Sequence, residues 1–251
     1  MKRLGKLYAE TPDWHGQTVQ IFYGGSDIIF RWNVWEANEG QGLVQIAARL
    51  DGTGPSNNIR FYGNVVYVDY YKNPSTPGFN STGGIFGNAW VYNYVNNIFL
   101  YNNTFVNIGG DYGGVANFPN IGPYTNWNSY NNLFYNCHST SYSGWTVYGY
   151  HASGGGDTAG GTNEQTGLLS SIFRNYTNND FILLQHTNPG LNLTSQSWWN
   201  ATPDNFFSQL DYDMDMYGNT RGTDGTWDRG AYEYISGECP TPIVSFTMNI
   251  I

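Results

Sequence analysis

One asparagine-centred pattern recurs four times along this chain and restricts its fold more than any other feature. The central residues are Asn33, Asn64, Asn103 and Asn132. Apolar residues alternate before each of them, as in IRFYGN and IFLYNN, and resume in a different phase directly after it. Alternation with a period of two is typical of a β-strand that buries one face. The change of phase indicates that the chain bends between two strands at each asparagine.

Asparagine suits such a bend for two reasons. It tolerates the left-handed backbone conformation better than any residue except glycine. Its side-chain amide can also bond to an equivalent asparagine in the next layer of stacked strands. Hairpin turns favour an asparagine that is followed by glycine, whereas Val, Val, Thr and Leu follow here. The pattern therefore favours parallel stacked coils with an asparagine ladder over an antiparallel sandwich.

Two motifs near the C-terminus add a family resemblance. They are DMYGNTR at 215–221 and DRGAYEY at 228–234. Together with the repeats, they resemble the right-handed parallel β-helix family (the pectate-lyase-like superfamily), specifically its bacterial extracellular members. The chain departs from the family pattern at Tyr217 and Arg229.

The resemblance implies a fold, a location and a structural role for two residues. We expect an all-β protein, a single right-handed parallel β-helix with long loops on one side, that is extracellular or on the cell surface. The terminal motif implies that Arg221 and Asp228 are structural. We expect these two side chains to form an ion pair that closes the C-terminal end of the coil.

The chain divides into a helix and a tail. We expect residues 1–234 to form the β-helix, without its native N-terminal coils, and residues 235–251 to form a C-terminal tail. Stretches rich in glycine, proline and asparagine at 51–58, 72–90 and 109–127 exceed what a bare coil needs, so we expect loops there. The tail alternates like a strand over 243–251, so it can add to a sheet edge of its own or of a neighbouring subunit.

A column of aromatic residues is the first candidate for a binding surface. Arg31, Tyr62, Tyr101 and Tyr130 each stand two residues before a central asparagine, and alternation points them outward. Stacked coils repeat at about 4.8 Å and a pyranose spans roughly 5 Å, so each coil can present one ring to each sugar. The alternative is that the tyrosines only stabilise the strands by cross-strand pairing.

Catalytic residues are harder to identify. Members of the family that are polysaccharide lyases abstract a proton with Lys or Arg, and basic residues are few here. The candidates are Lys72, Arg60 and Glu36. The alternative is that these are ordinary surface charges. Whether the protein is an enzyme stays open, and a lyase-like or glycosidase-like activity would be expected if it is.

Composition limits the partners and cofactors. Ten Lys and Arg residues against 19 Asp and Glu residues give a net charge of −9, which repels nucleic-acid phosphates. No apolar run approaches the roughly 18 residues of a membrane span. No His or Cys cluster has metal-ligand spacing, so we predict no metal site. Calcium stays a candidate because Asp211, Asp213 and Asp215 resemble part of a calcium loop, although the terminal motif explains Asp215 structurally.

Modification stays open as well. Five N-x-S/T triplets offer candidate glycosylation sites, although chance alone gives about five in such a composition. They begin at Asn80, Asn102, Asn175, Asn192 and Asn200. Cys137 and Cys239 could form one disulfide that fixes the tail, or could remain two thiols.

Two functions fit these observations. The first is an extracellular β-helix that binds, and in one version cleaves, a polysaccharide. The second is a non-catalytic surface or filament protein that associates with itself through the C-terminal tail. The first takes its support from the fold resemblance and the aromatic column, and the second from the scarcity of catalytic signals and the strand-like tail.

Overall fold

The computed structural model describes residues 17–22, 26–36, 42–47, 56–67, 86–87, 95–108, 125–137, 145–157, 159–196 and 213–237. Several predicted features lie outside these residues. They are Lys72, the sequons at Asn80 and Asn200, Cys239, and the tail from residue 238 onward.

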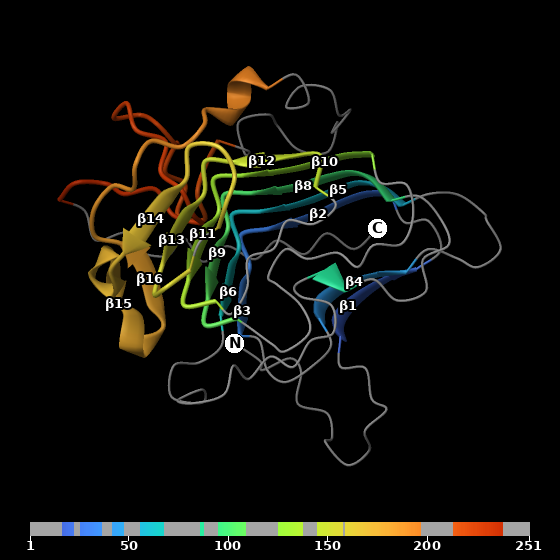
Figure 1. The fold of residues 1–251 in the computed structure, drawn as a ribbon, viewed down its shortest axis with the longest axis horizontal. Helices are drawn as coiled ribbons and strands as arrows, with labels where there is room; N and C mark the ends of the chain where they lie inside the picture. Colours follow the sequence, from blue (N-terminus) through green and yellow to red (C-terminus); the bar gives the residue numbers. More distant parts are fainter. Residues whose placement is uncertain are drawn as a thin grey trace, which may run out of the picture.

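Three parallel sheets form the body of the molecule (Figure 1). The first contains β1 (Gln17–Phe22), β4 (Gly42–Ala47) and β7 (Phe86–Gly87). The second contains β2 (Ser26–Arg31), β5 (Ser56–Tyr62), β8 (Val95–Tyr101), β10 (Thr125–Tyr130) and β12 (Val147–Gly149). The third contains β3 (Val34–Glu36), β6 (Val65–Tyr67), β9 (Thr104–Val106), β11 (Leu133–Tyr135), β13 (Ala152–Gly154) and β14 (Gln165–Leu168).

The chain visits these sheets in turn, so each circuit adds one strand in register beside its predecessor. Ile28 pairs with Ile59 and Ile59 with Ile98, while Val34 pairs with Val65. The predicted parallel β-helix is confirmed, and right-handed connections are the rule between parallel strands of one sheet. All three predicted loops were too long, because residues 56–58, 86–87 and 125–127 belong to β5, β7 and β10.

The asparagine ladder is confirmed between the second and third sheets. The Asn103 Oδ1 atom accepts bonds from the backbone N–H and the Nδ2 of Asn64, at 3.0 and 3.1 Å. In the same way, the Asn132 Oδ1 atom accepts bonds from the backbone N–H and the Nδ2 of Asn103, both at 3.0 Å. Each rung thereby ties one coil to the next inside the protein.

The predicted position of the left-handed residue is wrong by one. The residue before each rung, not the ladder asparagine, has positive φ. These residues are Trp32, Gly63, Asn102 and Asn131, with φ between 53° and 63°. Because that residue makes the bend, the ladder asparagine can keep its amide pointing into the stack.

The stack also continues beyond the fourth asparagine. His151 takes the next position, where its Nδ1 accepts the backbone N–H of Asn132 at 3.1 Å. Burial and the nearby charge of Arg229 lower the pKa of His151 to about 3, so its imidazole is neutral at physiological pH. The coils shorten here: Asn132 and His151 are 19 residues apart, and Ala152 already pairs with Gln165.

Side chains that point inward fill the coil. Ile59, Ile98 and Trp127 form one buried row, and Phe61 and Leu100 belong to the next. Phe105 stacks on Phe134 with ring centroids 5.2 Å apart. Burial of such aromatic and aliphatic side chains is the main favourable contribution to folding.

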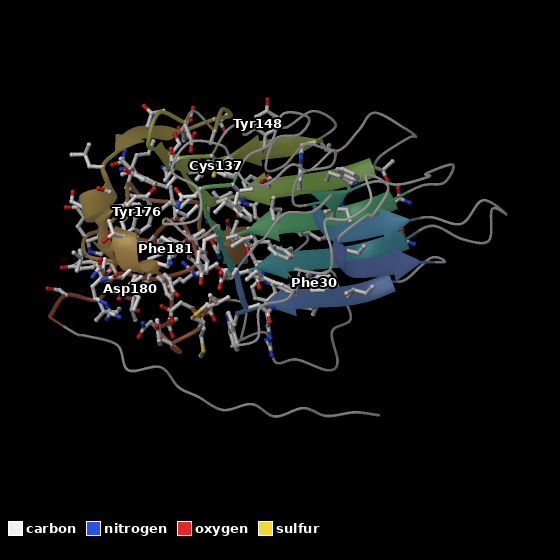
Figure 2. The ribbon with its side chains drawn as sticks, turned by 90° about the horizontal axis from the view of Figure 1, so that it is seen from below. Phe30, Cys137, Tyr148, Tyr176, Asp180 and Phe181 are labelled. Atoms are coloured by element: carbon white, nitrogen blue, oxygen red, sulfur yellow. The ribbon has the colours of Figure 1, made fainter. Side chains whose placement is uncertain are left out.

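A second layer covers the outer face of the third sheet. It contains η2 (Ser170–Ile172), β15 (Phe173–Asn175), η3 (Tyr176–Asn178) and β16 (Asp180–Leu183), and β15 and β16 pair antiparallel. Phe181 packs on Tyr67 at 5.4 Å and Phe173 on Tyr135 at 5.3 Å. Tyr176 and Phe181 mark this hairpin in Figure 2. The third sheet is therefore closed to solvent on both faces over these coils.

Candidate functional site

The tyrosine column exists, but its predicted exposure is wrong. Tyr62 and Tyr101 stack with centroids 4.9 Å apart and planes 6° apart, yet they are only 1 % and 0 % exposed. Tyr130 is also buried. Leu193, at the start of η4 (Leu193–Ser195), and Trp227 pack on this column.

Corner asparagines hold this cover in place. Trp227 donates its indole N–H to the side-chain oxygen of Asn102 at 3.3 Å. Asn131 donates to the carbonyl of Leu191 and accepts the Leu191 N–H, both at 2.8 Å. The tyrosine column is thus an internal packing surface between the coil and its C-terminal layer, and a glycan cannot lie along it while this layer is in place.

The candidate catalytic residues do not form one accessible cluster. Arg60 is 1 % exposed, and its guanidinium lies 5.3 Å from the ring centroid of Phe99. Glu36 lies in the third sheet, on β3, whereas Arg60 lies in the second. Arg31, at the edge of the column, contacts the Tyr62 hydroxyl at 3.4 Å and the Trp32 ring at 4.4 Å. Lys72 lies outside the described residues.

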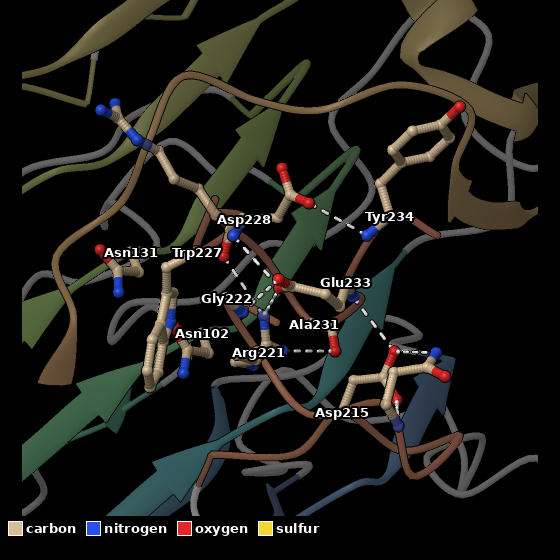
Figure 3. Close-up of polar contacts among 12 residues, drawn as sticks. Asn102, Asn131, Asp215, Arg221, Gly222, Trp227, Asp228, Ala231, Glu233 and Tyr234 are labelled. Carbon is tan, nitrogen blue, oxygen red and sulfur yellow. Dashed lines mark hydrogen bonds and ion pairs between the residues drawn. The ribbon is translucent and has the colours of Figure 1, made fainter. Parts of the chain in front are cut away.

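The terminal motif forms a buried polar network (Figure 3), but the predicted pairing within it is wrong. The carboxylate nearest Arg221 belongs to Glu233, at 3.5 Å. Arg221 reaches only the backbone carbonyl of Asp228, at 3.2 Å, and also donates to that of Ala231, at 2.8 Å. Two backbone carbonyls three residues apart, and a carboxylate two residues beyond the second, accept from the planar guanidinium group of Arg221.

Burial dominates the electrostatics of this network. It raises the pKa of Glu233 to about 7, although Arg221 and the backbone N–H of Gly222 act in the opposite direction. The Gly222 N–H donates to Glu233 Oε1 at 2.6 Å, and the Asp228 N–H to Oε2 at 3.1 Å. These contacts of Arg221 and Glu233 join parts of the terminal segment to one another, and the Asp228 side chain bonds to Thr187 and Tyr234. Both observations support the predicted structural role of Arg221 and Asp228.

Asp215 is part of the same framework rather than a calcium ligand. It is 1 % exposed. One oxygen accepts the N–H groups of Tyr217 and Asn219, and the other accepts Asn219 Nδ2 and the Glu233 N–H, at distances from 2.8 to 3.1 Å. Within the described ranges, no group of three or more His, Cys, Asp or Glu side chains is arranged to hold a metal ion. Asp211 falls outside those ranges.

An imidazole lies between two carboxylates at the edge of this network. His186 Nδ1 lies 3.0 Å from Asp228 Oδ2, and its Nε2 lies 3.4 Å from Asp224 Oδ2. The His186 and Asp224 side chains are each 38 % exposed, whereas Asp228 is buried. Tyr234 packs edge-to-face on the imidazole at 4.7 Å. No sequence motif marks this group, because Asp224 and Asp228 lie about 40 residues beyond His186 in the chain.

A second accessible group is a ladder of polar side chains at the beginning of the second sheet. Asn57, Asn96 and Thr125 occupy one column, in register. Asn58, Asn97 and Asn126 form the adjacent column and all have φ between 56° and 59°. Asn126 donates to Asn97 at 2.8 Å, and Thr125 donates to Asn96 at 2.5 Å. Thr125 and Asn126 are exposed, and the other four residues are half-buried.

The candidate glycosylation sites differ in how far their asparagine side chains are buried. Asn102 is 1 % exposed and bonded to Trp227, so the folded protein cannot carry a glycan there. Asn175 and Asn192 are exposed. The Cys137 thiol is buried against the carbonyl of Phe105, at 3.5 Å. A bridge from Cys137 to Cys239 stays a prediction.

Comparison of the chain with family models, with curated proteins and with solved structures found no significant match. In the part of the chain that the structure describes, no helix is long and apolar enough to cross a membrane. Function therefore has to be inferred from the residues and their contacts.

Proposed function

We propose that this protein is an extracellular or cell-surface β-helix that binds a neutral polysaccharide along the ladder of Asn57, Asn58, Asn96, Asn97, Thr125 and Asn126. One observation carries the proposal: on the three neighbouring strands β5, β8 and β10, this ladder presents amide or hydroxyl groups that are exposed or half-buried. The tyrosine column offers the same repeat but is buried.

The chemistry of the ladder suits sugar hydroxyls. Amide and hydroxyl side chains both donate and accept hydrogen bonds, as sugar hydroxyls do. Adjacent strands repeat at about 4.8 Å, close to the length of one pyranose, so successive coils can meet successive sugars. The ladder side chains are uncharged and the protein has a net charge of −9, which favours a neutral polymer over a polyanion.

The arrangement of the described residues supports binding of a polysaccharide without its cleavage. The candidate catalytic residues Arg60 and Glu36 lie in different sheets, and Arg60 is buried. The test of cleavage is simple. Incubation with uronate and neutral polymers should release neither unsaturated products nor reducing ends.

Retention on immobilised polysaccharides tests the binding site. The double variant Asn97→Gly/Asn126→Gly removes two ladder amides while glycine still accepts the positive φ of both positions. We expect its retention on the bound polymer to fall at least tenfold. Asn107→Gly/Asn136→Gly is the matched control, because this pair has φ of 56° and 53° and the same amide bond of 2.8 Å at another corner. Equal retention of both variants and the parent on every polymer would refute the site.

The alternative, a non-catalytic surface or filament protein, has one observation of its own. β12 and β14 are the last strands of their sheets. Exposed apolar side chains lie there, with Val147 at 44 %, Tyr148 at 36 % and Leu169 at 72 % exposure. Such an edge can accept a further strand. Light scattering that shows self-association, lost on Leu169→Lys or on deletion of 239–251, would favour this function.

A further inference from the structure

The geometry points to a zinc-type metal site formed by His186 and Asp224, independent of the polysaccharide ladder. The site would take one divalent transition-metal ion between His186 Nε2 and the Asp224 carboxylate. Solvent or an oxygen donor from another molecule would complete the coordination. This inference goes beyond the proposed function and rests on different residues.

The orientation of the imidazole is the first step. Asp228 is buried, and its Oδ1 atom accepts the N–H of Thr187 at 2.7 Å and the Thr187 hydroxyl at 3.1 Å. Its Oδ2 atom accepts the Tyr234 N–H at 3.0 Å and faces His186 Nδ1 at the same distance. A carboxylate can only accept, so Nδ1 carries the proton and donates to Oδ2. In the neutral imidazole, Nε2 then presents its lone pair.

The contact on the other side of the ring offers a place for a metal ion. With the proton on Nδ1, the Nε2 lone pair faces Asp224 Oδ2, which is also an acceptor. Their separation is 3.4 Å, longer than the usual 2.7–3.2 Å of an N–H···O hydrogen bond. Zinc bonds to histidine nitrogen and carboxylate oxygen at about 2.0–2.2 Å, so two ligands of one tetrahedral ion lie about 3.4 Å apart. The observed separation therefore matches the distance expected between two ligands of one bridging metal ion.

The surroundings agree with this assignment. A metal-ligating histidine commonly donates its other ring N–H to a carboxylate, which fixes the ring and makes it a better ligand. Asp228 has that position here, and the edge-to-face contact with Tyr234 at 4.7 Å further restricts the ring. The Asp224 side chain is held by a hydrogen bond of its own: its Oδ1 accepts the Thr226 N–H at 2.9 Å. Both ligands are therefore positioned before a metal arrives.

The ligand set predicts which ions bind. Imidazole favours zinc, copper and nickel, whereas calcium and magnesium prefer a shell of oxygen ligands. Two protein ligands leave two tetrahedral positions open, so binding should be weaker than at a structural zinc site with four protein ligands. We expect the parent protein to bind one Zn²⁺ at this site and no Ca²⁺.

Isothermal titration of the full chain with ZnCl₂ and CaCl₂ tests the proposal. Asp224→Asn should weaken Zn²⁺ binding at least tenfold, and its amide can still accept the Thr226 N–H, so the fold should be kept. Asp180→Asn is the control, because Asp180 is also an accessible carboxylate and lies in a salt bridge to Arg174. It should bind as the parent does.

A second variant separates this site from other histidines. His15→Gln/His138→Gln should keep Zn²⁺ binding, and His186→Gln should lose it. The inference is overturned if the parent binds no Zn²⁺, which would leave a protonated imidazole as the explanation of the contact. It is also overturned if Asp224→Asn binds as tightly as the parent. Polysaccharide retention by Asp224→Asn should be unchanged, so this inference and the proposed function can fail separately.

Discussion

Replacing a central rung of the asparagine ladder should destabilise the protein far more than replacing its first rung. Asn103 is 0 % exposed, and its side chain makes five hydrogen bonds. It accepts two from Asn64. It donates to the carbonyls of Phe61 and Tyr101 and to Asn132 Oδ1, at 2.8, 3.0 and 3.0 Å. Asn103→Ala removes all five.

The size of the effect follows from these contacts. A buried hydrogen bond contributes about 0.5–1.5 kcal/mol, and a polar group left buried without a partner costs about 1–3 kcal/mol. Asn103→Ala takes the side-chain acceptor from the buried Asn64 N–H, so we expect a loss of about 3–5 kcal/mol in the free energy of unfolding. Among the described residues, Asn33→Ala removes two side-chain bonds, to the Arg31 carbonyl and to Asn64 Oδ1, at a half-buried position. It should cost roughly 1 kcal/mol.

Urea unfolding followed by tryptophan fluorescence measures both variants. The midpoint should fall much further for Asn103→Ala than for Asn33→Ala, with similar slopes if unfolding remains two-state. Equal losses for the two variants would show that the ladder contributes no more in the buried middle of the stack than at its first rung. A loss below about 1 kcal/mol for Asn103→Ala would refute the ladder as a main source of stability.

Two further predictions concern buried titratable groups. Burial raises the pKa of Glu233 from 4.5 to about 7. The protonated Glu233 therefore contributes its full stabilisation below pH 4.5, and this contribution is lost as the pH rises through 7. The loss in the free energy of unfolding is at most about 3 kcal/mol. Glu233→Gln should flatten the fall in urea midpoint between pH 5 and 7.5, and an unchanged pH profile would contradict the shift. Burial lowers the pKa of His151 from 6.5 to about 3; its contribution is therefore present above pH 6.5 and is lost as the pH falls toward 3. His151→Asn can still accept the Asn132 N–H, and it should reduce this loss of stability at acid pH. At pH 7 it should destabilise the protein less than His151→Leu does. If His151→Leu were the less destabilising variant, His151 would not be a rung of the ladder.

The coil itself was predictable from the sequence because its determinants are local and repeat. The alternation before Asn64 and Asn103, and the strand residues after them, specify two short strands and a bend whatever the rest of the chain does. The rung at His151 was missed because it has no asparagine and its coil has only 19 residues. A search for the inward pattern, rather than for asparagine, would have found it.

The functional surface could not be predicted in the same way. Alternation shows that Tyr62 and Tyr101 point away from the coil, but not what lies beyond them. Trp227, which covers the column, comes 126 residues after Tyr101 in the chain. The hydrogen bond from its indole N–H to Asn102 joins residues that are 125 positions apart. A contact of that sequence separation leaves no periodic signal, so an outward side chain and an exposed one look identical in the sequence.

The sequence by itself determined the strands on either side of the four ladder asparagines, their register and the ladder, because these coils repeat a hydrophobic pattern that parallel stacking satisfies. The tertiary structure alone decided which outward surfaces remain accessible. It buried the tyrosine column under Leu193 and Trp227 and paired Arg221 with Glu233. It left the ladder of Asn97 and Asn126 and the His186–Asp224 pair accessible. The physical reason is that burial depends on what the C-terminal layer covers, and that layer docks through long-range contacts.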